Sequence, residues 1–126
     1  MKILFIFLFF LLSLVSCASN MVVVPPNATA EKLIQLAQEE SDKNRYDNAL
    51  EYYRAVIDTY PSRIDSVCAA EYEIAFIHYK QKKYGEAKDE LNQLLTRYNN
   101  TEAETYPSQY KILASIVIKK IEEKGK

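Results

Sequence analysis

Glycine is scarce in this sequence, with Gly85 and Gly125 the only two among its 126 residues. A phosphate-binding loop places several glycines in one short stretch, so we expect no nucleotide site of that type. Histidine is scarcer still: His78 is the only one, and Cys68 has no second cysteine or histidine at metal-ligand spacing. We interpret His78 as a buried or half-buried helix side chain and Cys68 as a small buried thiol. The sequence therefore predicts no enzyme, no cofactor and no metal site.

The sequence also has no excess of charge of one sign, because it contains 16 lysines and arginines and 17 aspartates and glutamates. Proteins that bind nucleic acids carry a basic patch or stripe, which this balance does not provide. We therefore expect no nucleic-acid partner. The two cysteines are Cys17 and Cys68. The role predicted below for Cys17 leaves Cys68 alone, so no internal disulfide is expected.

The one long hydrophobic run lies at the N-terminus. After Lys2, residues 3–12 contain only isoleucine, leucine and phenylalanine. A helix that spans a bilayer needs about 20 apolar residues, so the run is too short for one. Nothing in it is amphipathic, as a buried core helix would be. Its length and position are typical of an export signal, and we assign residues 1–16 to a signal peptide that is removed.

Residues 14–17, Leu-Val-Ser-Cys, resemble the lipobox of bacterial lipoproteins. The resemblance implies cleavage after Ser16 and acylation of Cys17, which becomes the lipid-anchored N-terminus; the alternative is an ordinary signal peptide with an incidental cysteine. Acyl chains contribute about 0.8 kcal/mol per buried methylene, so several of them hold a protein stably at a membrane. Because Ala18 rather than aspartate follows the cysteine, the resemblance favours the periplasmic face of the cell outer membrane. Residues 17–28 are then a lipidated tether.

From Thr29 the pattern is helical to the end, which places the folded domain at residues 29–124. Thr29 can cap the first helix, and a second helix is expected from about Asp47 until Pro61 ends it. The apolar residues on one face of the first helix are Leu33, Leu36 and Ala37. In the tether, Val22–Val24 could form a short strand or could pack on the first helix or on a partner.

The helical segment repeats itself when the chain is shifted by 38 residues. The superposed pairs are Ala37 with Ala75, Tyr46 with Tyr84, Ala49 with Ala87, Tyr60 with Tyr98, Val56 with Leu94, and Ile57 with Leu95. All of them lie at positions expected in the interior. A Tyr-x-x-Ala motif stands where each first helix gives way to the second, and its alanine lets two helix backbones approach closely. The repeat indicates helical hairpins stacked into a solenoid.

These motifs resemble tetratricopeptide repeats. That family places a small residue midway along its first helix, as at Ala37 and Ala75, and an aromatic residue before an alanine twelve residues on. Pro61 matches the proline that ends a unit. The period of 38 exceeds the family's period of about 34, which implies about four extra residues in the stretch 62–66.

A third unit supplies one more first helix, in which Leu113–Ala114 matches Ile74–Ala75. The resemblance therefore implies an all-α fold, a short tetratricopeptide-like solenoid of two helical hairpins plus a terminal helix.

The Tyr-Pro-Ser linker at 60–62, with the alanine pair 69–70 after it, is similar to one group of lipoproteins. That group is the BamD family of the outer-membrane β-barrel assembly machinery, with the related Tol–Pal accessory proteins. The resemblance covers residues 30–123 and implies a protein-interaction adaptor, whose partners are other envelope proteins such as a β-barrel assembly protein. The alternatives are a scaffold for cell-envelope enzymes, a secretion pilotin, or a surface-exposed ligand-binding lipoprotein.

An aromatic row is the first candidate for partner binding. Tyr72, Phe76 and Tyr79 recur at i, i+4 and i+7 on the expected third helix. First helices line the concave groove in tetratricopeptide repeats, and aromatic clusters often dominate binding energy. The alternative is that Tyr72 and Phe76 pack against neighbouring first helices.

The last helix provides the second candidate. On a helical projection its core face comprises Tyr110, Leu113, Ala114, Val117, Ile118 and Ile121. Ile112 and Ile116 fall well outside that face at about 100° per residue. If exposed, they form a docking surface for a partner; the alternative is that they rest on the loop from Asn99 to Tyr106.

Overall fold

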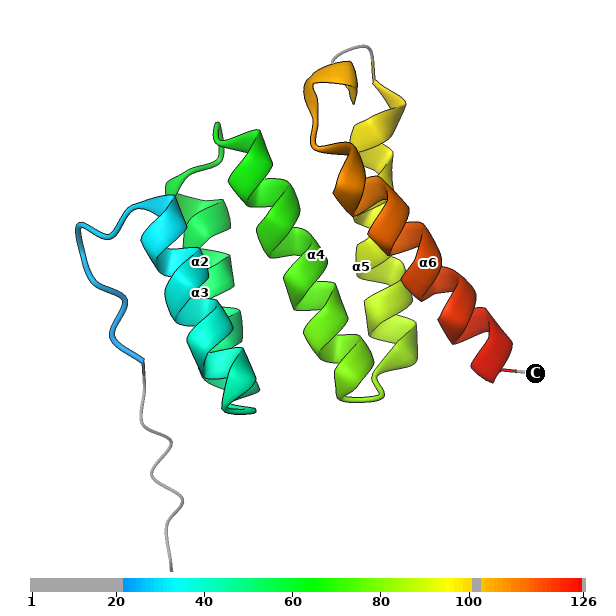
Figure 1. Ribbon diagram of the computed structural model, residues 1–126, viewed down its shortest axis with the longest axis horizontal. Coiled ribbons are helices and arrows are strands. Elements are labelled where there is room, and N and C mark those ends of the chain that lie inside the picture. The colour runs from blue at the N-terminus through cyan, green and yellow to red at the C-terminus, as the bar shows by residue number, and fades with distance from the viewer. Residues whose placement is uncertain (1–21, 101–102, 126) are drawn as a thin grey trace, which may run out of the picture.

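The computed structural model describes residues 22–100 and 103–125, and all regular secondary structure in these residues is helical. The α-helices are α2 (Ala30–Asp42), α3 (Tyr46–Thr59), α4 (Ile64–Lys80), α5 (Tyr84–Thr96) and α6 (Ser108–Lys124). Two short 3₁₀ turns, Arg97–Asn99 and Ala103–Thr105, lie between α5 and α6. The predicted all-α class is confirmed (Figure 1).

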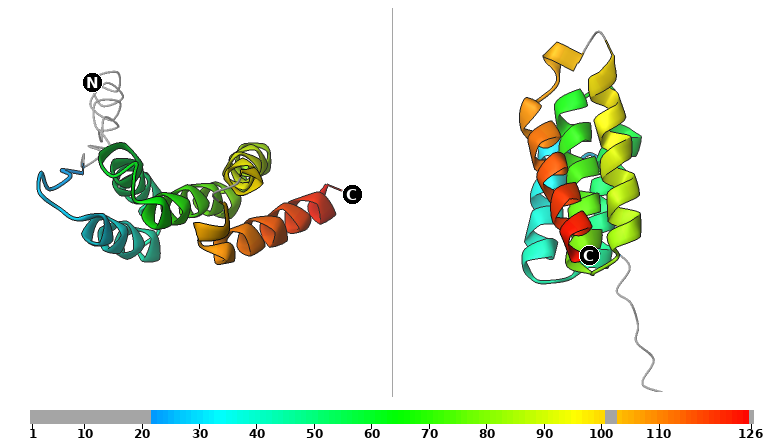
Figure 2. Two further views of the ribbon diagram at one scale, coloured as in Figure 1. Left: turned by 90° about the horizontal axis from the view of Figure 1, so that it is seen from above. Right: turned by 90° about the vertical axis from the view of Figure 1, so that its right-hand side faces the viewer.

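The helices form two hairpins and a terminal helix, as the repeat predicts. α2 packs on α3, α4 packs on α5, and α6 packs on α5 and α4. In the left view of Figure 2, α2 and α6 flank α4 on one side of the array, and α3 and α5 flank it on the other. The helices α2, α4 and α6 are therefore the first helices of successive units.

Buried alanines occupy the places where these helices approach one another. Ala37, Ala75 and Ala114 stand at matching positions of α2, α4 and α6, and none has exposed surface. Ala49 of α3 and Ala87 of α5 are equally buried. A single methyl group lets the neighbouring helix come close, and a larger side chain would have to displace well-packed atoms. The sequence repeat thus corresponds to a structural repeat.

Helix α4 belongs to both halves of the core. Ala70 and Ile77 join the cluster formed by α2 and α3, whereas Cys68, Tyr72 and Ala75 join the cluster formed with α5 and α6. Nine of the 17 residues of α4 are buried, against three of 13 in α2. Because α4 packs on both sides, it fixes the position of one hairpin relative to the other.

The turn inside each hairpin has the same backbone conformation. Asn44 and Lys82, which are 38 residues apart, have positive φ angles of 57° and 63°. The amide of the next residue donates to the carbonyl oxygen of Glu40 in the first turn and of His78 in the second, at 2.9 Å in both. Glu40 and His78 therefore hold equivalent places in the last turn of their helices.

The four extra residues lengthen a helix, not a loop. α4 has 17 residues and α2 has 13, and the position equivalent to Ala30, where α2 begins, is Cys68. Residues 64–67 thus form an additional N-terminal turn of α4.

This extra turn changes how the two repeated tyrosines are held. The hydroxyl of Tyr60 donates to the carbonyl oxygen of Ala28, ahead of α2, at 2.7 Å. The position equivalent to Ala28 is Ser66, which lies inside α4 and is not at a free helix end. Tyr98 instead donates to the carbonyl oxygen of Pro107, ahead of α6, at 2.8 Å. Each tyrosine thus ties its hairpin to the start of a first helix.

The segment before α2 is described only in part. Residues 1–16, the lipobox and Cys17 lie outside the described residues. Val22–Val24 form no strand, and Val24 packs against the core between α2 and α3. Thr29 caps α2 as predicted, because its hydroxyl accepts the amide of Lys32 at 3.2 Å. None of the described helices is long and apolar enough to cross a bilayer.

One position of the expected core is wrong. The helical projection predicts Leu113 on the core face of α6, but 37% of its surface is exposed. Ala114, Val117 and Ile121 are buried as expected. Since α6 contacts α4 and α5 on one side only, its buried arc is narrower than that of a helix packed on both sides.

Replacement of Ala49 or Ala87 by leucine tests the close contacts. Both alanines are fully buried between packed helices. The larger leucine side chain must displace neighbouring atoms, so each change should lower the free energy of unfolding by about 1–3 kcal/mol. Chemical denaturation of each variant measures this. A change of only a few tenths of a kcal/mol for both would contradict the alignment of the repeats.

Candidate functional site

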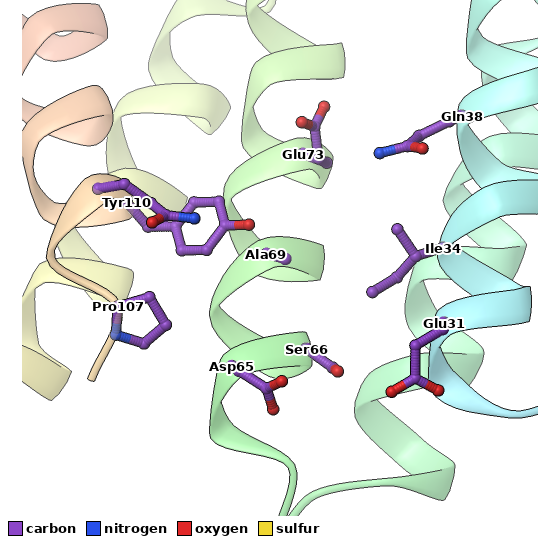
Figure 3. A pocket seen from close by; sticks show the side chains of 10 residues that line it. Glu31, Ile34, Gln38, Asp65, Ser66, Ala69, Glu73, Pro107 and Tyr110 are labelled. Atoms are coloured by element: carbon purple, nitrogen blue, oxygen red, sulfur yellow. The ribbon is translucent and has the colours of Figure 1, made fainter. Parts of the chain in front are cut away.

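A hollow lies between the three first helices (Figure 3). Its volume is about 300 Å³, and its lining comes from α2, α4 and the start of α6. The floor is α4, where Ser66 and Ala69 are buried and stand one helical turn apart. Because both side chains are small, the surface of α4 is low here and the flanking helices rise above it.

Each flanking helix contributes one large apolar side chain to a wall of the hollow. Ile34 of α2 points towards α4 from one side, and the ring of Tyr110 of α6 lies over Ala69 from the other (Figure 3). Both are half-buried. The Tyr110 ring is held in place by Tyr72, with ring centroids 5.9 Å apart. Gln38 and Gln109 add amide groups to the two walls, so polar backbone groups of a bound segment could be satisfied.

Acidic side chains line the hollow from both α2 and α4. Arg63 contacts two of them: its Nη2 lies 2.6 Å from Glu31 Oε1, and its Nε lies 3.5 Å from Asp65 Oδ1. The pKa of Glu31 is lowered by a backbone hydrogen bond at the start of α2 and then by Arg63. The pKa of Asp65 is lowered first by the amide of Ser66. These two carboxylates are therefore compensated within the protein.

Glu73 is the acid of the hollow that is not compensated in this way. Among the described residues, none forms a hydrogen bond or an ion pair with its half-buried carboxylate. Burial raises the pKa of Glu73, and the charge of Lys80 only partly opposes this effect. A buried Tyr53 hydroxyl, likewise without a hydrogen-bond partner in the described residues, has its pKa raised by burial and then by the charge of Glu73. A cationic group in the hollow would restore a favourable environment for this carboxylate.

The predicted aromatic row lies beside the hollow and is mostly covered. Tyr72 is buried under α6, with its ring stacked on Phe76 at 5.7 Å. Phe76 stacks on Tyr79 at 5.8 Å, and Tyr79 contacts the ring of Tyr84 at 5.7 Å. The ammonium group of Lys80 covers the face of Phe76 at 5.4 Å. For Tyr72 the alternative, packing against a neighbouring first helix, is what the structure shows.

Ile112 and Ile116 are exposed on α6. Their exposed fractions are 59% and 46%, and Leu113 next to them is 37% exposed. They do not rest on the described part of the loop before α6. The predicted apolar patch at this end of the array is therefore larger than expected by one leucine.

His78 and Cys68 have the environments that the sequence suggested. Burial raises the pKa of the Cys68 thiol, which makes this group a poor nucleophile. His78 is 3% exposed and packs towards α5, where Nδ1 lies 2.7 Å from Glu90 Oε2. The neighbours of His78, Glu86 and Glu90, were not foreseen, because they lie eight and twelve residues away and on another helix.

Replacement of Glu73 by glutamine should stabilise the protein at neutral pH. A carboxyl group whose pKa is raised on folding costs stability while it is ionised, and this cost disappears once the pH falls below its ordinary value of 4.5. The melting temperature of Glu73→Gln should therefore exceed that of the unmodified protein at pH 7, and the two should converge near pH 4. Glu123→Gln, at an exposed site on α6, should show no such difference at either pH. A Glu73→Gln variant less stable than the unmodified protein at pH 7 would refute this account of the carboxylate.

The comparisons with known proteins identify the repeat. The chain is 32% identical over 98 residues to an uncharacterised protein of Treponema pallidum (strain Nichols), a match that covers 78% of this chain and 39% of that protein. The chain thus spans less than half the length of this relative. No solved structure matches this chain significantly. The tetratricopeptide repeat pattern matches residues 30–63 and 69–101, which together make up more than half of the sequence and coincide with the two hairpins. The chain therefore belongs to the tetratricopeptide repeat family.

Proposed function

We propose that this protein is a lipid-anchored, non-catalytic adaptor of the bacterial cell envelope, which holds a segment of a partner protein in the hollow between α2, α4 and α6. Tetratricopeptide repeats imply protein partners in general. The observation that carries the proposal is the uncompensated carboxylate of Glu73 in a hollow whose two walls each offer one apolar side chain, Ile34 and Tyr110.

The chemistry of the hollow selects the kind of segment. Three acidic side chains line it, and among the described residues the basic side chain that pairs with them is Arg63, which contacts Glu31 and Asp65. A lysine or arginine of the partner can reach Glu73, while apolar groups beside it pack on Ile34 and Tyr110. The volume of about 300 Å³ is at the lower end for binding pockets. It therefore suits one or two side chains of a longer segment that runs along the groove.

The envelope location rests on the N-terminal sequence. The hydrophobic run of residues 3–12 and the Cys17 motif support export and acylation, and Ala18 favours the periplasmic face of the outer membrane. Within that location, the similarity to the BamD family favours a subunit of the β-barrel assembly machinery. A scaffold for envelope enzymes, a secretion pilotin and a surface-exposed ligand-binding lipoprotein are the alternatives that partner identification would separate.

Photo-crosslinking in native membranes tests the groove. A photoreactive amino acid at Gln38 or at Gln109, on opposite walls of the hollow, should yield the same crosslinked partner. Adding Glu73→Lys should reduce that product by about tenfold or more, because a charge-assisted hydrogen bond contributes about 1.5–3 kcal/mol. Asp89→Lys, on the exposed surface of α5 away from the hollow, should leave the yield unchanged. Equal loss in both lysine variants, or no loss in either, would contradict groove binding.

The lipid anchor is tested by Cys17→Ala. Without the thiol no acyl chain can be attached, so an unprocessed precursor should accumulate and should incorporate no labelled fatty acid. Metabolic labelling and gel mobility measure both effects. Cys68→Ala is the matched control and should be processed normally, since that thiol is buried in the folded domain. Normal processing and membrane retention of Cys17→Ala would end the lipoprotein assignment.

We further propose that the exposed patch of Ile112, Leu113 and Ile116 is a second contact with the partner. Apolar residues surrounded by lysine and glutamate are typical of protein interfaces. These residues lie on α6, the helix that also provides one wall of the hollow, so one partner could contact both surfaces.

Serine at both Ile112 and Ile116 should abolish co-purification of the partner and should leave the melting temperature nearly unchanged, because both side chains are exposed. Val117→Ser on the same helix should instead lower the melting temperature, since Val117 is buried. A pull-down unchanged by the double replacement would rule out this second contact.

A further inference from the structure

A buried histidine and two carboxylates meet at the turn between α4 and α5. His78 of α4 is 3% exposed, and its ring lies between two glutamates of α5. Nδ1 is 2.7 Å from Glu90 Oε2, and Nε2 is 3.8 Å from Glu86 Oε1. One donor atom from each residue lies within 4.8 Å of the other two. These residues line neither the hollow nor the apolar patch on α6.

The first hairpin shows which groups the other repeat places here. The residues equivalent to His78 and Glu86 are Glu40 and Asn48. Glu40 accepts a hydrogen bond from Asn48 Nδ2 at 2.8 Å, and both of its oxygens are bonded by the guanidinium of Arg45 at 2.5 Å. The first site is thus a closed network of one acid and its donors.

The second site has the same backbone frame and a different set of groups. An imidazole replaces the acid, Glu86 replaces the amide, and Glu90 adds a second carboxylate. The backbone bond from the turn to the His78 carbonyl oxygen, 2.9 Å long, keeps the helix end in place. The backbone frame of the repeat therefore places the three side chains beside one another.

The two nitrogens of the ring have different surroundings. Nδ1 lies within hydrogen-bond distance of Glu90 Oε2, and in the tautomer with the N–H on Nδ1 that group donates to Glu90 while the lone pair of Nε2 faces Glu86. The Nε2–Oε1 distance of 3.8 Å is too long for a hydrogen bond. It is a normal separation for two ligands of one metal ion, each about 2.0–2.2 Å from the metal. A carboxylate on the far nitrogen is the usual means of orienting a metal-binding histidine.

The donor set agrees with a divalent cation. The site offers one imidazole nitrogen and two carboxylates within reach of one another, and such groups bind divalent metal ions. A mixed nitrogen and oxygen donor set favours zinc over calcium or magnesium, which prefer oxygen ligands. The side chain of Glu86 is 52% exposed, so the ion can enter and water can complete its coordination.

We propose that His78 Nε2 and Glu86 bind a divalent transition-metal ion, with zinc the best fit, and that Glu90 orients the imidazole ring. The ion would join α4 to α5 beside their connecting turn and would stiffen the second hairpin.

A zinc titration of the metal-stripped full-length protein in detergent tests this site. His78 is the only histidine, so histidine ring signals in a ¹⁵N NMR spectrum report on this residue alone. Zinc should shift the Nε2 resonance with saturation near one equivalent, while Nδ1 stays protonated. A ring that zinc does not change, or one protonated at both nitrogens and held between the two acids, would overturn the proposal.

Variants separate the ligands from their surroundings. Glu86→Gln should weaken zinc binding by about tenfold or more, and Glu90→Gln by about 10–100-fold, both measured by calorimetry. Asp89→Asn, which lies on α5 between these residues and is exposed, should bind zinc as tightly as the unmodified protein. Cys17 is present in every variant and therefore cannot cause a difference between them. Unchanged zinc affinity in Glu86→Gln would overturn the proposal.

Discussion

Close approach of helices at buried alanines is the constraint on which the rest of the structure depends. Ala37, Ala75 and Ala114 set the spacing of the first helices, and Ala49 and Ala87 set the spacing within the hairpins. With these contacts made, α4 packs against α2 and α3 on one side and against α5 and α6 on the other. The two hairpins then form one array with two core clusters, and α4 contributes residues to both.

The hollow and the histidine site are both consequences of this packing. Because α2 and α6 flank α4 on the same side (Figure 2), the small residues Ser66 and Ala69 become a floor with a wall on each side. Glu73 lies in the same space and is partly desolvated, which is unfavourable for stability. At the turn, the repeat places His78 where the first hairpin has Glu40. The backbone conformation is the same in both hairpins, but the side chains at this place differ.

The sequence predicted the repeat well, because its alanines and tyrosines lie at interior positions where packing admits few other residues. It predicted less well which side chains are exposed and which line the hollow. The spacing of Tyr72, Phe76 and Tyr79 marks a helix face correctly, but spacing cannot tell that Tyr72 would be covered by α6. Glu73 escaped notice because its importance comes from burial and from the lack of a counter-charge, which depend on the whole fold. The repeat shift maps Glu40 and Asn48 onto His78 and Glu86, but the contact between Glu40 and Asn48 is known only from the fold, and Glu90 corresponds to Tyr52, which offers no such signal.

Carboxyl labelling of Glu73 tests the central claim, that a partner occupies the hollow. A water-soluble carbodiimide would be applied to native membranes and to the purified protein, with Asp89 on α5 as the internal reference, and labelling would be quantified by mass spectrometry. Binding in the hollow predicts that Glu73 is protected in membranes relative to Asp89 and becomes reactive after purification. Equal labelling of Glu73 in both preparations, with Asp89 also unchanged, would contradict it.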